Sequence, residues 1–530
     1  MRKRKFLNQL RSYLIKLKRF FLYDSLLLLI LGGLSSLSLP PFNYFWINFF
    51  TFSILLIFLF NKLKKKNSKK NSFYYGWFFG FGYFLTSLYW ITISLTFDKN
   101  FIFLIPITLI LVPSFLALFY GLITLIFYLY NPKNILSAFF LFSLLFGVIE
   151  FARGSILTGF PWNLIIYSFS KNLAFINIIS VIGTYSLNLI VISFFALPAV
   201  YILRSSKKDT VICIFLMLLP ILFFFYGTFQ KNTFTKNAEK ENPYIIRVIG
   251  SNISLNRFYD STQAETVINE LINLSSPEKK KKIFFIWPEG IIPNTYQDEI
   301  NLYSDIFKKN FDENHIIGLG ITSRNTKGDK YDYYNSLSIF DYDLNLIHEY
   351  KKVKLVPFGE FIPFESLLKK IGFKTITSNF GSFNNGKTRK IIKVSEKHNQ
   401  FKFLPLICYE IIYSGNLSKD FDFDFILNIS EDGWFGKSIG PKQHFAHSIF
   451  RAIENGKYVI RASNNGMAAI INPLGQIEKK IDYDKNGYID FEKRKKFDKT
   501  IFSTFGNIIF IIFILMYIFL IFSFNRFKNE

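Results

Sequence analysis

Eight apolar segments constrain this chain more than any other feature of its sequence. A helix needs about 20 consecutive apolar residues to cross the hydrocarbon core of a bilayer. The segments that meet or approach this length are Ser25–Leu39, Phe42–Phe60, Phe73–Leu95, Phe103–Tyr130, Ile135–Ser155, Phe175–Leu203, Val211–Thr228 and Ile501–Phe524. The first is short for a span and is followed by Pro40-Pro41. The sequence therefore predicts a membrane α-helical bundle of about eight spans.

Basic residues in the short connections predict the orientation of this bundle, because Lys and Arg are retained on the cytoplasmic side of a membrane. They cluster in residues 2–19 and again in residues 62–70, after the second span. With both clusters in the cytoplasm, the alternation of spans places the segment between spans seven and eight outside it. We therefore predict a membrane part (1–228) with seven helices, an exported domain (229–499), and a last span with a cytoplasmic tail (500–530).

The formal net charge of +25 belongs mainly to that topology signal. Residues 1–228 and 500–530 together contain 23 basic and 5 acidic residues, whereas residues 229–499 contain 40 and 33. The exported domain is therefore only mildly basic. The sequence contains no nucleic-acid-binding module and no phosphate-cradling glycine loop, so nucleic acid is not an expected partner.

From Tyr244 onward, short runs rich in Ile and Phe replace the long apolar segments, which indicates strands. The predicted strands are Tyr244–Ile249, Ile283–Trp287, Ile316–Ile321, Ser336–Asp341, Phe403–Ile407, Phe425–Ile429, Tyr458–Ala462 and Met467–Asn472, and the segments Gln263–Leu274, Gln297–Asn310 and His444–Glu454 fit helices. Several strands lack polar alternation, as expected for a sheet covered on both faces. The exported domain is therefore predicted to be α/β.

A lone thiol stands in this domain, since Cys213 lies in the seventh predicted span and Cys408 is the other cysteine of the chain. A single thiol in an oxidising compartment indicates that its chemistry is used rather than cross-linking. A thiol is mostly protonated at neutral pH and needs a base, which Glu289 would supply. A tetrahedral oxyanion needs a fixed positive donor, which Lys352 would supply together with the backbone N–H of Tyr409.

The order of Glu289, Lys352 and Cys408, with their surroundings, resembles the carbon-nitrogen hydrolase (nitrilase) superfamily. The segments that carry the resemblance are Trp287-Pro288-Glu289-Gly290, Leu355-Val356-Pro357-Phe358-Gly359-Glu360-Phe361-Ile362-Pro363, Ile407-Cys408-Tyr409-Glu410, Trp434-Phe435-Gly436, Gly440-Pro441 with Gln443-His444, and Arg461-Ala462-Ser463-Asn464-Asn465-Gly466. With the eight spans, Glu150-Phe151-Ala152-Arg153-Gly154 and Gly159-Phe160-Pro161-Trp162, essentially the whole chain resembles the apolipoprotein N-acyltransferase family of the bacterial inner membrane. The resemblance implies an exported α-β-β-α sandwich.

By position, the resemblance implies that Cys408 is the nucleophile, Glu289 the general base and Lys352 the oxyanion stabiliser. The choice of Lys352 among its neighbouring lysines rests on its place eight residues before Glu360, as in the family. Glu360 would support the site as a second glutamate. Glu410, two residues after the cysteine, would help to shape it.

Aromatic residues in the matching loops have two interpretations. Phe358, Trp434 and Phe435 bind the acyl substrate in one interpretation and form ordinary core in the other. One departure from the family pattern is that Phe258-Tyr259 stands where the family usually has Trp. His444 and His447 are three residues apart, but no third ligand with metal spacing follows, so neither a metal nor any other cofactor is expected.

The resemblance implies a ping-pong acyl transfer through a cysteine thioester. The expected donor is a membrane glycerophospholipid, the expected acceptor is the N-terminal amine of diacylglyceryl-cysteine on an apolipoprotein, and the enzyme is expected to be a monomer in the inner membrane whose catalytic domain faces the periplasm. A membrane-tethered amidase or nitrilase is a second hypothesis, but eight spans exceed what a tether needs. A transporter is a third, but the spans lack the paired broken helices and buried charges that would mark a transport pathway. Glu150 and Arg153 are instead expected to pair with each other.

Overall fold

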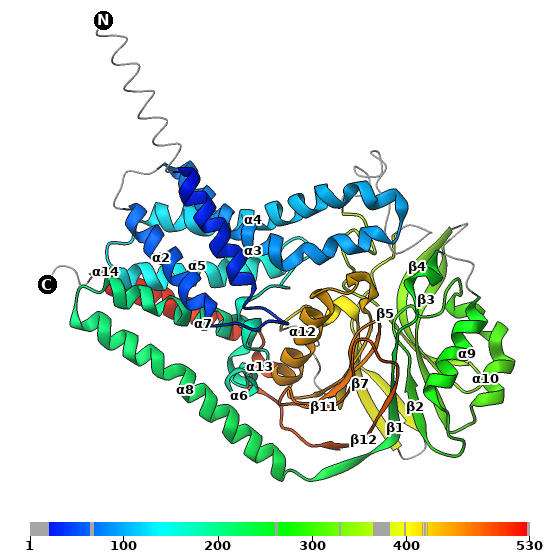
Figure 1. Cartoon of the computed structure of the whole chain (residues 1–530). Helices are drawn as coiled ribbons and strands as arrows, with labels where there is room; N and C mark the ends of the chain where they lie inside the picture. Colours follow the sequence, from blue (N-terminus) through cyan, green and yellow to red (C-terminus); the bar gives the residue numbers. More distant parts are fainter. Residues whose placement is uncertain are drawn as a thin grey trace, which may run out of the picture.

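The computed structural model describes residues 21–63, 68–259, 263–327, 330–363, 382–396, 399–415, 417, 420 and 422–526. The amino-terminal basic cluster and Lys64 to Lys66 of the second cluster lie outside the described residues. Figure 1 shows a helical part packed beside a β-rich part.

Apolar helices build the first part (Figure 1). They are a first helix over Phe21–Ser36, α2 (Ile47–Leu63), α3 (Lys69–Leu88), α4 (Ile105–Tyr130), α5 (Ile135–Ser155), α6 (Leu173–Ile176), α7 (Ile179–Leu203) and α8 (Lys207–Lys236), and the chain returns to this part through α13 (Ile501–Phe505) and α14 (Ile508–Arg526). Short 3-10 helices, η1 (Tyr89–Thr96), η2 (Lys99–Leu104) and η3 (Ile165–Phe169), lie between them.

Each predicted span overlaps one or more of these helices. Among the described residues, six helical segments are long and apolar enough to cross a membrane: Lys69–Thr96, Lys99–Tyr130, Ile135–Ser155, Ile179–Leu203, Lys207–Lys236 and Ile508–Asn525. The helices over Phe21–Ser36 and Ile47–Lys62 are apolar but shorter. That these two helices also span the membrane stays a prediction. Helix α8 continues past residue 228, the predicted end of the membrane part, to Lys236.

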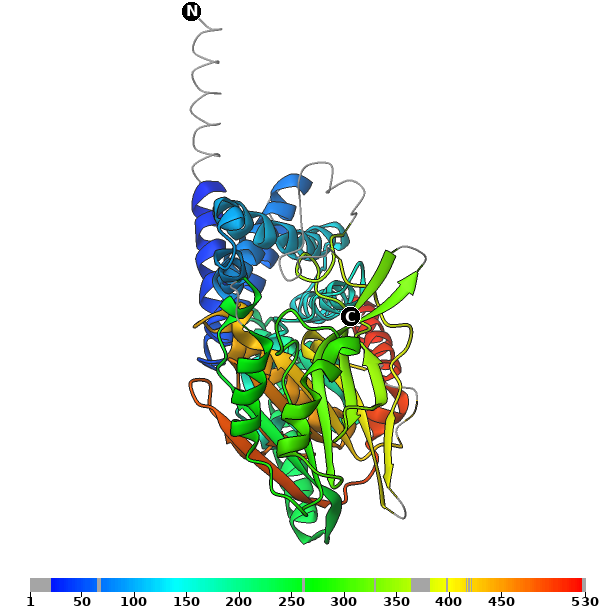
Figure 2. The same ribbon diagram turned by 90° about the vertical axis from the view of Figure 1, so that its right-hand side faces the viewer.

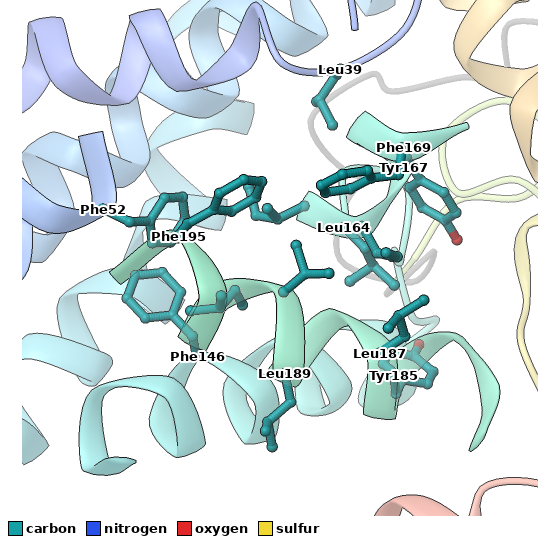
Figure 3. Packing of buried hydrophobic residues seen from close by; sticks show 14 of the residues in the cluster. Leu39, Phe52, Phe146, Leu164, Tyr167, Phe169, Tyr185, Leu187, Leu189 and Phe195 are labelled. Atoms are coloured by element: carbon teal, nitrogen blue, oxygen red, sulfur yellow. The ribbon is translucent and has the colours of Figure 1, made fainter. Parts of the chain in front are cut away.

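Aromatic rings fill the centre of the helical part. Phe52 of α2 meets Phe146 of α5 edge-on with ring centroids 5.3 Å apart, and it lies 6.3 Å from Phe195 of α7. Figure 3 shows these three rings beside one another in the buried cluster. Such aromatic pairs contribute about 0.5–1.5 kcal/mol beyond the area they bury. Part of the high Phe content therefore packs helix against helix.

Glu150 and Arg153 of α5 form a fully buried ion pair in this part. Arg153 Nε donates to Glu150 Oε2 at 2.9 Å, and Tyr120 OH donates to Glu150 Oε1 at 2.6 Å. Arg153 Nη1 also donates to the carbonyl of Phe160. The predicted pairing is confirmed. Each charge offsets part of the desolvation of the other, and Arg153 also binds the loop that contains Phe160.

Twelve strands of the β-rich part belong to one hydrogen-bonded sheet. They are β1 (Glu239–Ser251), β2 (Ile283–Ile286), β3 (His315–Lys327), β4 (Lys330–Asp341), β5 (Leu346–Lys351), β6 (Ile392–Glu396), β7 (Asn399–Ile407), β8 (Phe425–Glu431), β9 (Tyr458–Asn464), β10 (Ala468–Ile471), β11 (Ile477–Ile481) and β12 (Gly487–Lys495). Their order is β5-β4-β3-β2-β1-β9-β8-β7-β6, with β12 beside β1, β10 beside β9, and β11 beside β10. The halves meet at β1 and β9 through two residue pairs, Gly250 with Ser463 and Ser251 with Asn464.

The two halves of the sheet pack face to face. Val248 and Ile286 from the first half share one buried cluster with Phe403, Leu427 and Ile460 from the second half. Helices α9 (Ala264–Ser275) and α10 (Ser304–Asn310) cover the outer face of the first half and lie in front of the strands in Figure 2. Helix α12 (Gly440–Asn455) covers the outer face of the second half. The predicted α-β-β-α layers are present, but the two β layers are halves of one continuous sheet.

Helix α12 also joins the sandwich to the helical part (Figure 1). Gly183, with φ of +78°, interrupts the helical backbone of α7, which restarts at Thr184. Glu454 Oε1 of α12 accepts hydrogen bonds from Thr184 N at 2.9 Å and from Ser414 Oγ at 2.6 Å. A carboxylate at the start of a helix satisfies its unpaired N–H groups and favours its dipole. Buried polar contacts therefore link the two parts.

Six of the predicted strands lie within observed strands, and Ile283–Trp287 and Met467–Asn472 extend slightly beyond β2 and β10. Strands β5, β6, β11 and β12 were not predicted. Strands β11 and β12 carry many charged residues, and every residue of β11 except Ile481 is exposed. An exposed strand lacks the apolar signal of a buried one. The predicted helices correspond to α9, to η5 (Gln297–Tyr303) with α10, and to α12.

Candidate active site

Three chemically important side chains follow the ends of three strands. Glu289 comes shortly after β2, Lys352 directly after β5, and Cys408 directly after β7. All three are buried, with 7%, 1% and 7% of their surfaces exposed. Gly320 of β3 allows the close approach of the Glu289 turn, because an added Cβ there would lie 2.5 Å from Glu289 Cα. The sheet therefore supplies a rigid frame for groups carried on loops.

Lys352 joins two carboxylates. Its Nζ lies 3.0 Å from Glu289 Oε1 and 2.8 Å from Glu360 Oε1. Burial by itself lowers the pKa of Lys352, but the charges of Glu289 and Glu360 outweigh it and raise this pKa well above its usual range. The ammonium is therefore positively charged at neutral pH. Burial, with the charge of Glu289, raises the pKa of Glu360 against the opposing effect of Lys352.

Asn335 of β4 is a part of this cluster that sequence reasoning missed. Its Nδ2 donates to Glu289 Oε1 at 2.7 Å and to Glu360 Oε1 at 2.6 Å, the same two oxygens that Lys352 contacts. The backbone N–H of Glu431 donates to the other oxygen, Glu289 Oε2, at 2.9 Å. Both oxygens of Glu289 are therefore oriented. The sequence signal that could have found Asn335 is an amide side chain at the start of the buried part of a strand.

Cys408 adopts a backbone conformation that is rare for a side chain other than glycine, with φ of +49°. Such a conformation persists where the surroundings hold it. Burial and the negative charges of Glu289 and Asp432 raise the pKa of the Cys408 thiol well above its usual range, while Lys352 and a hydrogen bond with Ser430 lower it. The thiol is therefore protonated at rest, so forming a thiolate requires a base at the moment of reaction.

The carboxylate of Glu410 ties the Cys408 turn to the segment after Lys352. It is fully buried and accepts from the N–H of Ile407 at 2.9 Å. Its other donors are the N–H groups of Val353 and Lys354 at 3.1 Å each, Tyr350 OH at 2.8 Å, and Arg389 Nη2 at 3.0 Å. One side chain thus joins two loops of the site, and its shaping role stays a prediction.

Glu410→Gln is expected to destabilise the sandwich by about 3–5 kcal/mol, the cost of leaving a buried charge such as that of Arg389 without its partner. Equilibrium unfolding in detergent measures this loss. Glu241→Gln provides the matched control, because the Glu241 side chain is 82% exposed and lies 3.6 Å from the Lys493 ammonium. Equal stability of the two variants would contradict the structural importance of Glu410.

Tyr409 points away from the carboxylate cluster and toward the helical part. Its hydroxyl donates to the carbonyl of Gly159 at 3.0 Å, and Tyr413 OH donates to the same carbonyl at 3.1 Å. Gly159 has a φ of +74° and an added Cβ there would lie 2.4 Å from the carbonyl oxygen of Gly154. The turn after the cysteine is therefore attached to a loop of the helical part.

Phe358, Trp434 and Phe435, predicted either to bind the acyl substrate or to form core, have different surroundings. Phe358 is 47% exposed and has a φ of +62°. Trp434 is half-buried and stacks on Phe258 with ring centroids 5.9 Å apart. Phe435 packs between Trp90 and Trp162, at 4.8 and 5.6 Å. Of the Phe258-Tyr259 segment, which departs from the family pattern, Phe258 thus stacks on Trp434. Phe435 lies where the sandwich meets the helical part.

A second buried network lies behind the thiol. Ligand atoms of Cys408, Asp432 and His444 lie within 4.8 Å of one another. The fold therefore places two potential metal ligands beside His444 that the sequence spacing did not indicate. Asp432, however, already accepts two hydrogen bonds from Arg461 Nη2, at 2.8 and 2.9 Å. A metal ion would have to compete with this guanidinium. We therefore interpret the group as a hydrogen-bonded network.

Comparisons with known proteins agree over nearly the whole chain. The family model described as the apolipoprotein N-acyltransferase N-terminal domain matches residues 31–197, and the carbon-nitrogen hydrolase model matches residues 267–492. The apolipoprotein N-acyltransferase of Rickettsia prowazekii is 34% identical, with 93% of this chain and 98% of the relative covered. The protein of the same name from Rhodopseudomonas palustris is 31% identical, with 91% of each chain covered.

Proposed function

We propose, from the premise that this chain belongs to the apolipoprotein N-acyltransferase family, that it moves an acyl chain from a membrane glycerophospholipid to the N-terminal amine of diacylglyceryl-cysteine on apolipoproteins. The product is a triacylated lipoprotein. The observation that carries the proposal is a buried thiol, Cys408, beside the Glu289 and Lys352 cluster, in a sandwich attached to a bundle of apolar helices. Attachment of the sandwich to a bundle of apolar helices suits an enzyme whose substrate is dissolved in the bilayer.

In the first half-reaction, Cys408 Sγ attacks the ester carbonyl carbon of the phospholipid while Glu289 accepts the thiol proton. The raised pKa of Cys408 makes this base necessary. The oxyanion of the tetrahedral intermediate faces the Lys352 ammonium and the N–H of Tyr409. Collapse breaks the ester C–O bond, and Glu289 returns its proton to the departing lysophospholipid. The acyl chain remains as a thioester on Cys408.

In the second half-reaction, the amine of the acceptor cysteine attacks the thioester carbonyl carbon. Glu289 accepts a proton from the amine, and Lys352 again faces the oxyanion. Collapse breaks the C–S bond and forms the amide, and the Glu289 proton restores the thiol of Cys408. Both steps proceed with protein groups alone, because the ester and then the thioester are activated acyl donors.

Access for the acyl chain follows from where the aromatic residues lie. Phe358 is exposed, and Trp434 meets Phe97, just past the end of η1, edge-on at 5.7 Å. We propose that Phe358 and Trp434 line the entry of the acyl chain from the helical part. Phe435, packed against Trp90 and Trp162, then supports the wall of that entry.

Mass spectrometry of the purified chain tests the function directly. Incubation with a phospholipid that carries a deuterated acyl chain is expected to add that acyl group to Cys408. Addition of a diacylglyceryl-cysteinyl peptide is then expected to remove the adduct and yield the deuterated N-acyl peptide. Peptide acylation without an adduct would contradict the thioester, and loss of the adduct to water alone would favour the amidase-like hydrolase.

We also propose that the protein is a monomer of the bacterial inner membrane, composed of the three parts 1–228, 229–499 and 500–530, with the sandwich in the periplasm. The asymmetry of basic residues supports this orientation. In a chain without its two native thiols, Asn486→Cys on an exposed turn should react with a membrane-impermeant thiol reagent in intact spheroplasts, whereas Lys70→Cys at the start of α3 should not. The reverse labelling pattern would overturn the orientation.

A further inference from the structure

A buried histidine that the proposed mechanism does not use contacts the backbone of the nucleophile. His444 of α12 is fully buried, and its Nε2 lies 3.3 Å from the carbonyl oxygen of Cys408. Trp162 stacks on its ring with centroids 5.3 Å apart, and Phe435 meets the ring edge-on at 5.5 Å. The ring is therefore held in place on its face and its edge.

The partners of the two ring nitrogens determine where the hydrogen must be. The carbonyl of Cys408 can only accept, so the contact at Nε2 requires a hydrogen there. Nδ1 faces an acceptor, Asp432 Oδ1 at 2.9 Å, and also a donor, Arg461 Nη2 at 3.2 Å. Nδ1 consequently finds a partner whether or not it carries a hydrogen. The charged ring and the neutral ring with its hydrogen on Nε2 both keep the Cys408 contact, and they differ in whether Nδ1 donates to Asp432 or accepts from Arg461.

Burial favours the neutral state of the ring. Burial lowers the pKa of His444, and Arg461 adds to this effect against the opposing charge of Asp432. In the neutral ring, Nε2 donates to Cys408, and Arg461 Nη2 shares its two hydrogens between Nδ1 and the carboxylate of Asp432. Asp432 keeps Arg461 and the Ser430 hydroxyl, which donates to Asp432 Oδ1 at 2.7 Å, as its partners.

The hydrogen bond from His444 helps to hold Cys408 in its left-handed backbone conformation. Glu410 holds the N–H of Ile407 before the cysteine, and His444 holds the carbonyl of Cys408 itself. His444 thus holds the peptide group that follows the Cys408 Cα, and Glu410 holds the peptide group between Leu406 and Ile407, one residue further back. Their directions determine where Sγ points relative to Glu289 and Lys352.

We propose that His444 is a positioning residue for the nucleophile, which carries its hydrogen on Nε2 and holds the Cys408 carbonyl so that the thiol is presented to the Glu289 and Lys352 cluster. The inference rests on the proposed role of Cys408 in acyl transfer. Asp432 and Arg461 act through His444 by fixing its ring.

Nitrogen-15 NMR of the full-length, histidine-labelled chain in lipid bilayers tests the tautomer. His444→Gln identifies the His444 signals by their loss. We expect a neutral ring with its hydrogen on Nε2. A neutral ring with its hydrogen on Nδ1 would overturn the proposal, because Nε2 would then have nothing to donate to Cys408.

Two matched variants test the positioning. His444→Gln places an amide N–H near the position of Nε2, whereas the shorter His444→Asn places its amide near Nδ1. We expect single-turnover acylation of Cys408 at saturating phospholipid to slow about tenfold in His444→Asn, the loss of one buried hydrogen bond, and to stay within about threefold of the parent in His444→Gln. The half-saturating phospholipid concentration should not change.

Equal rates for the two variants, whether both fast or both slow, would contradict the proposal, because the donor position would then not matter. Absence of any acyl adduct on the unmodified chain would instead refute the proposed function. In that case the NMR measurement still decides whether His444 donates to Cys408.

Discussion

Cys408→Ala is expected to form no acyl adduct with phospholipid and to transfer no acyl chain to a diacylglyceryl-cysteinyl peptide. The thioester needs a sulfur atom at this position, and alanine offers no nucleophile in its place. The substitution removes only the sulfur from a turn whose backbone Glu410 holds, so the variant should fold. Intact-protein mass spectrometry and peptide N-acylation measure the two losses separately.

Cys213→Ala is the matched control for this experiment. Cys213 is buried in α8 of the helical part, whereas Glu289 and Lys352 follow strands of the sandwich. We expect it to retain nearly full activity and to acquire one acyl group. Peptide N-acylation by the Cys408→Ala protein at the parent rate would disprove the assignment of the nucleophile.

Glu289→Gln and Lys352→Met are expected to give the next largest losses, for different reasons. Glutamine keeps the shape of Glu289 but cannot accept the thiol proton, and the raised pKa of Cys408 leaves little thiolate without that base. Methionine keeps the apolar stem of Lys352 but removes its charge. Loss of one such oxyanion donor costs about 2.7–4 kcal/mol of barrier, or roughly a hundred- to a thousandfold in rate. Single-turnover thioester formation measures both effects.

Lys351→Met tests whether the effect belongs to the correct lysine. Lys351 is adjacent in sequence, but its Nζ contacts Asn325 Oδ1 at 3.0 Å, outside the carboxylate cluster. We expect this variant to acylate at the parent rate. Normal acylation by Lys352→Met, or a comparable loss in Lys351→Met, would rule out the special role of Lys352. Because Lys352 neutralises two buried carboxylates, circular dichroism of each variant must show that the sandwich has folded.

Much of the architecture could be predicted because its signals are local. The span of α5, for example, is a continuous apolar run, and its Glu150 and Arg153 are one helical turn apart, close enough to pair whatever the rest of the fold. Strands β2, β8 and β9 are buried along their whole lengths, and each begins with an apolar run in the sequence. The exposed strand β11 carries three charged residues and has no such signal.

The sequence by itself determined the apolar helices, the α/β class of the domain, and the set of a carboxylate, an ammonium and a thiol at strand ends. Residue type and nearby spacing carry that information. Only the tertiary structure decided that Asn335 bridges Glu289 and Glu360, that Glu454 caps the restart of α7, and that His444 faces the Cys408 carbonyl. These contacts join residues that are far apart in the chain. Their partners are chosen by how the sheet folds on itself and where α12 packs, and neither leaves a periodic pattern in the sequence.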